Sequence, residues 1–346
     1  MKITAEPFGT AADGVPVTRY WLKDGDFRAA VLTWGGVLQS LLVPDRNGIP
    51  VDVVLGFENM KAYEKQNCFI GAVIGRCANR IGGGNFVLNG ERLSFPLNDG
   101  GVHHLHGGPM GFDRKHWEAR VLPDALELSL TSPVGENGYP GNLRVKVTYR
   151  LERGVLILTY DGASDADTLC SLTSHSYFNL AGEGDVGDQT IQVEAPAYAS
   201  HGSDHVPDGT LPSVEDTPMD LRKAVRLGGF WNNKFEQIRW YGGIDHYYPV
   251  EGNGMRFFGE ACCVETGIRM SVSSDCPGVQ VYTGNTLSAE NGKRGGRYGA
   301  HQGFCLETQG PPNPPVWPEE MWPVLRKGQH YHTETRFAFS NLTNLY

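Results

Sequence analysis

Strict alternation of apolar and polar residues recurs along this chain, and it restricts the fold more than any other feature. Residues 126–130 and 143–151 alternate at every position, and Ile268, Met270 and Val272 repeat the pattern. A period of two gives a β-strand one apolar face and one solvated face. Gly and Pro separate the runs at intervals of about 8–12 residues, which is typical of β-sandwiches and barrels. We therefore predict a large all-β, antiparallel fold with few short helices.

Local signals add one hairpin and two short helices. Asn89-Gly90 separates two alternating runs and predicts a type I′ turn, because both of its central residues need positive φ. Residues 60–66 and 219–225 can each hold two helical turns, and Asp220 provides a cap for the second. No repeat of fixed period, charge block or linker-like run interrupts the sequence. We expect a single domain over residues 1–346.

Charge and cysteine content restrict the partners and the compartment. The chain has 30 Lys and Arg against 39 Asp and Glu, a net charge of −9, which argues against nucleic-acid binding because that would need a basic patch. We see no secretory signal and no apolar run long enough to span a bilayer. The seven cysteines are an odd number without a Cys-x-x-Cys pair, which favours free thiols in a reducing compartment. We expect a cytoplasmic protein without nucleic-acid or membrane partners.

Two segments in the first third of the chain hold polar side chains suited to ligand binding. Residues 75–81 place two arginines and Asn79 before a run of glycines. These side chains can hydrogen-bond a polyol or an anion, or they can satisfy a turn. In the second segment, His104 and His106 would share one face of a strand, which a metal could use. Zinc needs three or four ligands and the companion spacing is missing, so we predict no metal site.

Two further segments carry candidate acid and base groups. His175 lies between two serines in an aromatic-rich run, either as a hydrogen-bonded core residue or as a placed proton carrier. Glu307 ends an apolar run, where a carboxylate is costly to bury unless it is hydrogen-bonded or used. Asp245 and Gln280 lie in segments that mix acids or amides with aromatic residues, a mixture that sugar sites use.

Taken together, these segments resemble motifs of the aldose 1-epimerase (galactose mutarotase) family. The matching segments follow the family's order from about Trp34 to about Phe339. They read Gly-Arg-Cys-Ala-Asn-Arg-Ile (75–81), Leu-His-Gly-Gly (105–108), His-Ser-Tyr-Phe-Asn-Leu (175–180), Val-Gln-Val-Tyr-Thr-Gly-Asn (279–285) and Gly-Phe-Cys-Leu-Glu-Thr-Gln (303–309). Each motif is moderately specific alone, whereas five in order are highly specific. The resemblance implies a large antiparallel β-sandwich that binds a sugar in an open groove.

The resemblance also implies a reaction and the roles of individual residues. It implies that Glu307 acts as general base at the C1 hydroxyl of an aldose and His175 as general acid at the ring oxygen, O5. The positions that match substrate-binding residues of the family are Asn79, Arg80, His106, Tyr177, Asp245 and Gln280. No hydride or other group is transferred, so no cofactor is implied. An ionised Glu307 with a protonated His175 predicts a bell-shaped dependence of rate on pH.

The sequence departs from the family pattern in two places. His103 stands where the family usually has Asn before Leu-His-Gly-Gly, and residues 310–318 are shorter and richer in proline than the usual loop. A proline-rich segment has a stiff, fixed shape. Because this segment follows Glu307 closely, we expect it to affect the choice of sugar rather than the reaction.

Three alternatives use the same residues. Glu307 and Asp245 provide the two carboxylates that a glycoside hydrolase needs. A non-catalytic sugar-binding protein would keep the binding residues without the chemistry. A phosphorylated sugar needs a basic cluster near the site, for which the sequence offers two groups, namely Arg222, Lys223 and Arg226, or Lys293, Arg294 and Arg297. The oligomeric state stays open.

Overall fold

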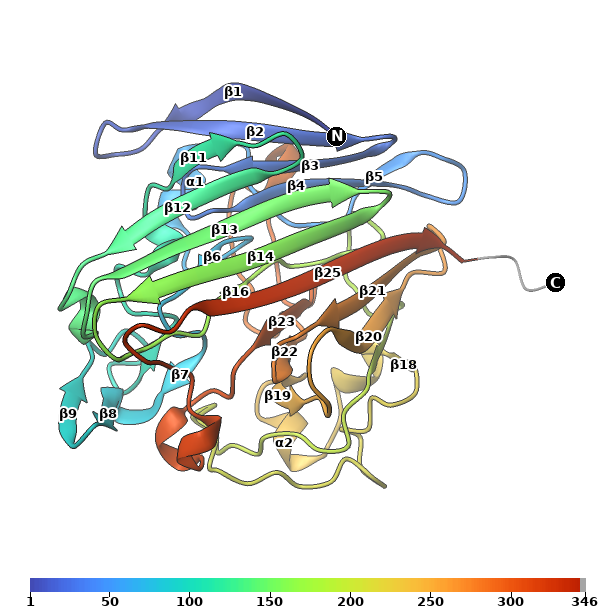
Figure 1. The fold of residues 1–346 in the computed structure, drawn as a ribbon. Coiled ribbons are helices and arrows are strands. Elements are labelled where there is room, and N and C mark those ends of the chain that lie inside the picture. The colour runs from blue at the N-terminus through green and yellow to red at the C-terminus, as the bar shows by residue number, and fades with distance from the viewer. Residues whose placement is uncertain (343–346) are drawn as a thin grey trace.

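Two large antiparallel sheets dominate the computed structural model, which describes residues 1–342 (Figure 1). The larger sheet has nine strands in the order β11 (Glu118–Val121), β12 (Leu126–Ser132), β13 (Leu143–Glu152), β14 (Val155–Ser164), β25 (Tyr331–Asn341), β21 (Ile268–Ser274), β20 (Arg256–Cys262), β17 (Thr190–Val193) and β18 (Val225–Arg226). The other has five strands, β1 (Lys2–Thr10), β2 (Pro16–Asp24), β3 (Phe27–Leu32), β4 (Leu38–Pro44) and β5 (Pro50–Asp52), in chain order. The C-terminal strand β25 lies in the middle of the nine-stranded sheet and joins its two halves.

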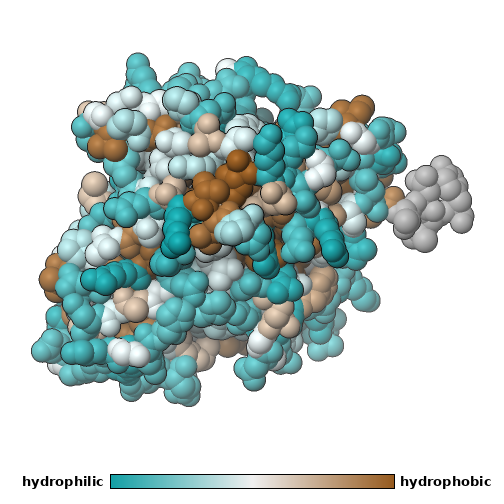
Figure 2. Space-filling model, turned by 45° about the horizontal axis from the view of Figure 1, so that its top comes forward, coloured by the Kyte–Doolittle hydropathy of each residue, from teal (hydrophilic) through white to brown (hydrophobic). Residues whose placement is uncertain are grey.

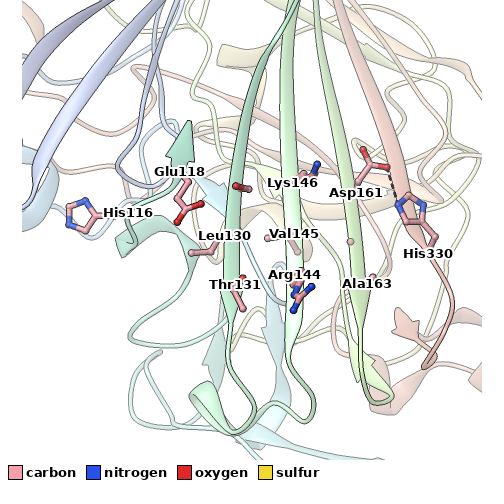
Figure 3. Close-up of a pocket in the computed structure, with 12 residues that line it drawn as sticks. His116, Glu118, Leu130, Thr131, Arg144, Val145, Lys146, Asp161, Ala163 and His330 are labelled. Carbon is pink, nitrogen blue, oxygen red and sulfur yellow. Dashed lines mark ion pairs between the residues drawn. The ribbon is translucent and has the colours of Figure 1, made fainter. Parts of the chain in front are cut away.

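The alternating runs form strands with one buried and one solvated face, as predicted. In β13, Val145 and Val147 are buried in the core, whereas Arg144 and Lys146 are exposed. Figure 3 shows the outer face, where these two cations and Asp161 of β14 surround a shallow hollow of about 570 Å³. The apolar face of the same strands is thereby directed to the interior of the sandwich.

A three-stranded sheet packs against the inner face of the nine-stranded sheet. It consists of β19 (Asp245–Pro249), β22 (Gly278–Tyr282) and β23 (Cys305–Gln309), in that order. Val279, Val281 and Leu306 of this sheet share one hydrophobic core with Val272 and Phe337 of the large sheet. Because neighbouring residues of a strand point to opposite faces, the other face of the small sheet is left for polar side chains.

Short strand pairs and short helices complete the fold. The pairs are β6 (Val73–Ile74) with β16 (Thr173–Ser174), β7 (Arg80–Ile81) with β10 (His104–Leu105), β8 (Asn85–Leu88) with β9 (Glu91–Ser94), and β15 (Thr168–Leu169) with β24 (Val324–Leu325). The α-helices are α1 (Met60–Lys65) and α2 (Glu236–Arg239), and single 3₁₀ turns occur at Gly82–Gly84, Phe112–Arg114, Glu136–Gly138, Leu227–Phe230, Lys293–Gly295, Pro314–Val316 and Glu319–Met321. Within residues 1–342, no helix is long and apolar enough to cross a membrane. The face shown in Figure 2 is largely hydrophilic, with scattered apolar residues and one apolar cluster near its centre.

Two of the local predictions are confirmed. Helix α1 forms within residues 60–66, where the Asn59 side chain caps it by accepting the Ala62 N–H. The hairpin of β8 and β9 turns at Asn89 and Gly90, with φ values of 53° and 82°. Both values are positive, as a type I′ turn requires.

The predicted helix over residues 219–225 is wrong. The Asp220 carboxylate accepts the backbone N–H of Arg222 at 3.0 Å, which forms a local turn. Such side-chain bonds to the backbone compete with helical hydrogen bonding, so the residue expected to cap a helix stabilises a turn instead. The nearest α-helix further along the chain is α2, which we did not predict.

Several contacts hold the proline-rich segment, residues 310–318. Asn313 adopts a left-handed φ of 53°, accepts the Gly82 N–H at 2.9 Å and donates to the Pro207 carbonyl at 2.8 Å. Trp317 donates its indole N–H to the Pro312 carbonyl at 2.6 Å. The segment is thus tied to two other loops and has a fixed shape directly after β23.

Candidate active site

The small sheet brings polar side chains to one cavity. Gln280 of β22 lies opposite Glu307 of β23, and Asp245 of β19 lies opposite Tyr282 of β22. Directly opposite residues present their side chains on the same face of a sheet. A cavity of about 340 Å³ opens on that face, and Asp245, Tyr282 and Glu307 line it. Apolar packing on the other face therefore fixes the strand phase that points the carboxylates into the cavity.

Glu307 and His175 form the buried centre of this cavity. His175 directly follows β16, and its Nε2 lies 3.8 Å from Oε1 of Glu307. His175 is 5% exposed and Glu307 is 2% exposed. Burial, followed by the charge of Asp245, raises the pKa of Glu307 well above its usual value, and burial lowers the pKa of His175 to about 4. Burial therefore favours the neutral form of each group.

His106 is fixed as a hydrogen-bond donor. Its Nδ1 accepts the backbone N–H of Asn79 at 3.1 Å. A neutral imidazole that accepts at Nδ1 carries its hydrogen on Nε2. Burial and then the neighbouring His175 lower the pKa of His106 well below its usual value, so the imidazole stays neutral. The Nε2–H of His106 is left to donate to a ligand oxygen.

A left-handed turn of the backbone aims this imidazole. His106 has a φ of 51° and Gly107 a φ of 84°. A Cβ atom on Gly107 would lie 1.8 Å from the Gly75 carbonyl oxygen, so only glycine allows the two segments to approach so closely.

The expectation that His104 and His106 share one strand face is wrong. Strand β10 ends at Leu105, and the chain then turns at His106. His104 points elsewhere, where its two nitrogens lie 2.8 Å from the Pro96 carbonyl and 2.8 Å from the Tyr139 hydroxyl. A buried histidine with both nitrogens hydrogen-bonded is a structural residue.

Three potential metal ligands come together, but their chemistry does not suit a metal. His106, His175 and Glu307 each offer one atom within 4.8 Å of the other two. Because Nδ1 of His106 accepts the Asn79 N–H, its Nε2 is protonated and has no lone pair for a metal. The two remaining ligands are fewer than the three or four of a zinc site. The arrangement favours proton transfer instead.

Three partners hold Asp245 in its ionised form. Gln280 Nε2 donates to Oδ1 of Asp245 at 2.7 Å, and His205 Nδ1 lies 3.2 Å from Oδ2. Burial alone would raise the pKa of Asp245, but the hydrogen bond and charge of His205, the charge of Arg80 and the Gln280 hydrogen bond together hold it below its usual value. Arg80 itself pairs with Asp99 at 2.6 Å. The cavity thus contains a fixed negative charge and a fixed guanidinium beside the neutral pair.

The structure brings most of the predicted site residues together. Seven of the eight line the cavity, namely Asn79, Arg80, His106, His175, Tyr177, Asp245 and Glu307. The eighth, Gln280, contacts Asp245 through its amide. The Tyr177 ring lies 5.0 Å from the His175 ring, measured between centroids, and so covers one side of the imidazole.

Sequence reasoning missed several residues of the site, among them Tyr282, Phe69 and His205. The ring centroid of Phe69 lies 4.6 Å from that of His106 and 5.8 Å from that of His175. Its position just after the predicted helix 60–66 was the only available signal. His205, which contacts Asp245, lies in an irregular loop where no periodicity indicates a partner.

Proton exchange and recognition of hydroxyl groups are the two tasks this cavity can perform. Glu307 and His175 are placed so that they could exchange protons, and Asp245 and Arg80 offer the polar groups that sugar sites use for hydroxyls. Aromatic rings such as Phe69 suit the C–H faces of a sugar. On a β-sandwich scaffold, this combination defines a carbohydrate-active acid/base enzyme.

Comparison with known sequences gives the family. The family model described as aldose 1-epimerase matches residues 18–338. Galactose mutarotase from Sus scrofa is 38% identical over 345 residues, which cover 98% of this chain and 99% of the relative. Aldose 1-epimerase from Escherichia coli K12 is 32% identical over 339 residues, which cover 95% and 97%. The chain belongs to the aldose 1-epimerase family and is an isomerase that interconverts the anomers of an aldose.

Solved structures agree with this assignment. The aldose epimerase homologue from C. elegans superimposes with a TM-score of 0.86 at 29% identity and covers 93% of this chain and 98% of its own. Galactose 1-epimerase from Lactobacillus acidophilus superimposes with a TM-score of 0.85 at 26% identity and covers 99% of both chains. The predicted galactose mutarotase-like β-sandwich is confirmed.

Proposed function

We propose that the substrate is a free aldohexose of the galactose or glucose type, with Glu307 as base and His175 as acid. Glu307 removes the proton of the C1 hydroxyl, and His175 delivers a proton to O5. The C1–O5 bond breaks, the C1 oxygen becomes an aldehyde oxygen, and the former ring oxygen becomes a hydroxyl. Rotation about the C1–C2 bond, followed by the same transfers in reverse, yields the other anomer. Atoms and electrons balance without a cofactor.

One observation carries this proposal, the 3.8 Å separation of His175 Nε2 and Glu307 Oε1 inside a buried cavity. The C1 hydroxyl and O5 are bonded to the same carbon, so the groups that serve them must lie close together. Each positioned acid or base typically contributes about 10²–10⁴-fold to a rate. Oε2 of Glu307 has no hydrogen-bond partner among residues 1–342, which leaves it to a substrate hydroxyl.

The pair has the proton content that this reaction needs. Because burial raises the pKa of Glu307 and lowers that of His175, the pair favours a state that holds one proton, on Glu307. Ring opening needs that proton on His175 rather than on Glu307. Hydroxyl groups that donate to the Glu307 carboxylate stabilise its ionised form. Sugar binding therefore favours transfer of the proton to His175.

We assign the remaining residues to binding. Arg80 and the ionised Asp245 bind hydroxyl groups, and the Nε2–H of His106 donates to O5 or to a neighbouring oxygen. Asn79 fixes the His106 tautomer through its backbone N–H. Gln280 acts through Asp245. Tyr177 covers the imidazole of His175, and the names of the mammalian relatives favour galactose as a substrate.

A phosphorylated sugar is the less favoured substrate. Arg222 pairs with Asp220, and Lys293 pairs with Asp52, so the two basic groups of the sequence are at least partly neutralised. Neither group lines the cavity, in which Arg80 is the only cation among the described lining residues. A phosphate dianion would meet more carboxylates than guanidinium groups there.

Polarimetry tests the proposal directly. We would follow the optical rotation of freshly dissolved α-D-galactose, and separately α-D-glucose, with wild type, Glu307→Gln and His175→Asn. Glu118→Gln on the exposed outer sheet face is the matched control (Figure 3). Wild type and the control should accelerate the drift, and each site variant should lower kcat by about 10²–10⁴-fold while remaining folded. Unimpaired site variants would show that the acid/base assignment is wrong.

Two further expectations remain proposals. We propose that residues 1–346 act as one domain, which is supported by a hydrophobic core that spans the nine-stranded, five-stranded and three-stranded sheets. We also propose a cytoplasmic location. It is supported by the free state of all seven cysteines, each of which lies within the described residues.

A further inference from the structure

The second ring nitrogen of His175 has an unusual partner. Nδ1 of His175 lies 3.6 Å from Sγ of Cys305, within hydrogen-bonding range for sulfur. Cys305 is fully buried at 0% exposure. It precedes Glu307 by two positions on β23, so both side chains point to the same face of the strand. One strand thus supplies a thiol to one side of the imidazole and a carboxyl group to the other.

A thiol can satisfy Nδ1 in both protonation states of His175. The S–H group is a weak donor and the sulfur a weak acceptor. When the imidazole is neutral, Cys305 donates to Nδ1, and the ring hydrogen is then on Nε2, facing Glu307. When the imidazole is protonated, Nδ1–H donates to the sulfur. Burial raises the pKa of Cys305 well above its usual value, so the thiol keeps its hydrogen.

The weakness of this hydrogen bond has a consequence for proton transfer. Catalytic histidines commonly have a carboxylate on the far nitrogen, which stabilises the imidazolium that forms. A neutral thiol provides orientation without that negative charge. A proton placed on His175 is therefore held weakly and is readily given to a sugar oxygen.

We propose that Cys305 is a positioning residue that fixes the tautomer of His175 with Nε2 toward the substrate and leaves its proton easy to transfer. This inference rests on the proposed role of His175 as the general acid. It assigns a function to a cysteine that otherwise would be a small apolar residue of the core.

Steady-state kinetics with matched variants test the proposal. Cys305→Ala should lower kcat by about tenfold through loss of orientation, with KM changed by less than about twofold. Cys305→Ser restores a donor and acceptor of similar size and should recover most of kcat. Cys276→Ala removes another buried thiol outside the cavity lining and should behave as wild type. Equal losses of kcat in Cys305→Ala and Cys276→Ala would overturn the proposal in favour of a general packing effect.

The tautomer is measured separately from activity. In sugar-free protein with ¹⁵N-labelled histidine, the signals of His175 are assigned by their loss in His175→Asn. Wild type and Cys305→Ser should show a single neutral form with the hydrogen on Nε2, whereas Cys305→Ala should show a mixture of tautomers. An unchanged tautomer in Cys305→Ala would overturn the proposal even if the protein were inactive on both hexoses. A lack of activity in wild type would instead contradict the proposed function.

Discussion

Replacing Glu307 by glutamine should stabilise the protein, and increasingly so as the pH rises. Burial, followed by the charge of Asp245, raises the pKa of Glu307 well above its usual value. A group with a raised pKa keeps its proton in the folded state at a pH where the unfolded chain has released it. The free energy of unfolding therefore falls with rising pH, from the ordinary glutamate pKa up to the raised one. Glutamine cannot ionise, so the variant is spared this loss.

Linkage gives the size of the effect. One proton bound only in the folded state changes the free energy of unfolding by about 1.4 kcal/mol per pH unit. At about 2.1 cal/mol/K per residue, a chain of 346 residues has an unfolding entropy of roughly 0.7 kcal/mol/K. The Tm of Glu307→Gln should thus gain about 2 °C on wild type per pH unit within this window. His175, whose pKa is lowered to about 4, contributes with the opposite sign but is present in both proteins.

Calorimetric scans at about pH 5, 6, 7 and 8 measure this difference. Glu118→Gln serves as control because Glu118 is exposed on the outer face of the large sheet (Figure 3). The Tm difference between the control and wild type should stay constant with pH, whereas that of Glu307→Gln should widen. A constant difference for Glu307→Gln from about pH 5 to 8 would refute the reasoning, because it would mean that Glu307 ionises as an ordinary glutamate.

Four further predictions concern other parts of the molecule. His175 should remain mostly neutral down to about pH 5, since its pKa is lowered to about 4, and an NMR titration with a midpoint near the ordinary value of about 6.5 would contradict this. Arg76→Met should lower the free energy of unfolding by about 4 kcal/mol, because the Arg76 guanidinium donates to four backbone carbonyl oxygens at 2.8–2.9 Å. Urea unfolding measures this loss, and Arg76→Lys should recover part of it. Gly107→Ala should lower both Tm and kcat, because the Cβ of the alanine would lie 1.8 Å from the Gly75 carbonyl oxygen. A variant with the Tm and kcat of wild type would count against the close approach of the backbone at Gly107 and Gly75. Asp245→Asn should raise KM more than it lowers kcat, and a selective loss of kcat in initial-rate polarimetry would place Asp245 in the chemistry instead.

The sequence predicts individual strands well and their arrangement poorly. Residues 143–151 form most of β13 because each apolar side chain in the run can be buried on one face. The same run contains no signal that β14 pairs with the C-terminal strand β25, since strand partners are chosen by packing of distant segments. Residues 219–225 show the limit of local rules, because the carboxylate of Asp220 satisfies a turn as readily as a helix end.

The site was predicted through motifs rather than through physical periodicity. Residue types identify Glu307 and His175 as candidate acid and base, but their 3.8 Å separation depends on strands that the sequence alone does not place. His104 and His106 are two positions apart, and only the left-handed φ of His106 separates their environments. Phe69 and His205 were missed because each lies in an irregular loop, where contacts are determined by the folded chain.

The pleat of β23 explains how one strand serves both stability and chemistry. Leu306 joins the core between the sheets, and Thr308 bonds Thr335 of β25 at 2.5 Å, so both fix the strand phase. Cys305 and Glu307 occupy the alternate positions and face His175. A shift by one residue would turn both away from the imidazole and into the core, so the register is strongly specified. The fold tolerates the buried Glu307 and His175 because burial favours the neutral form of each, and their charged forms are needed only once sugar hydroxyls can stabilise them.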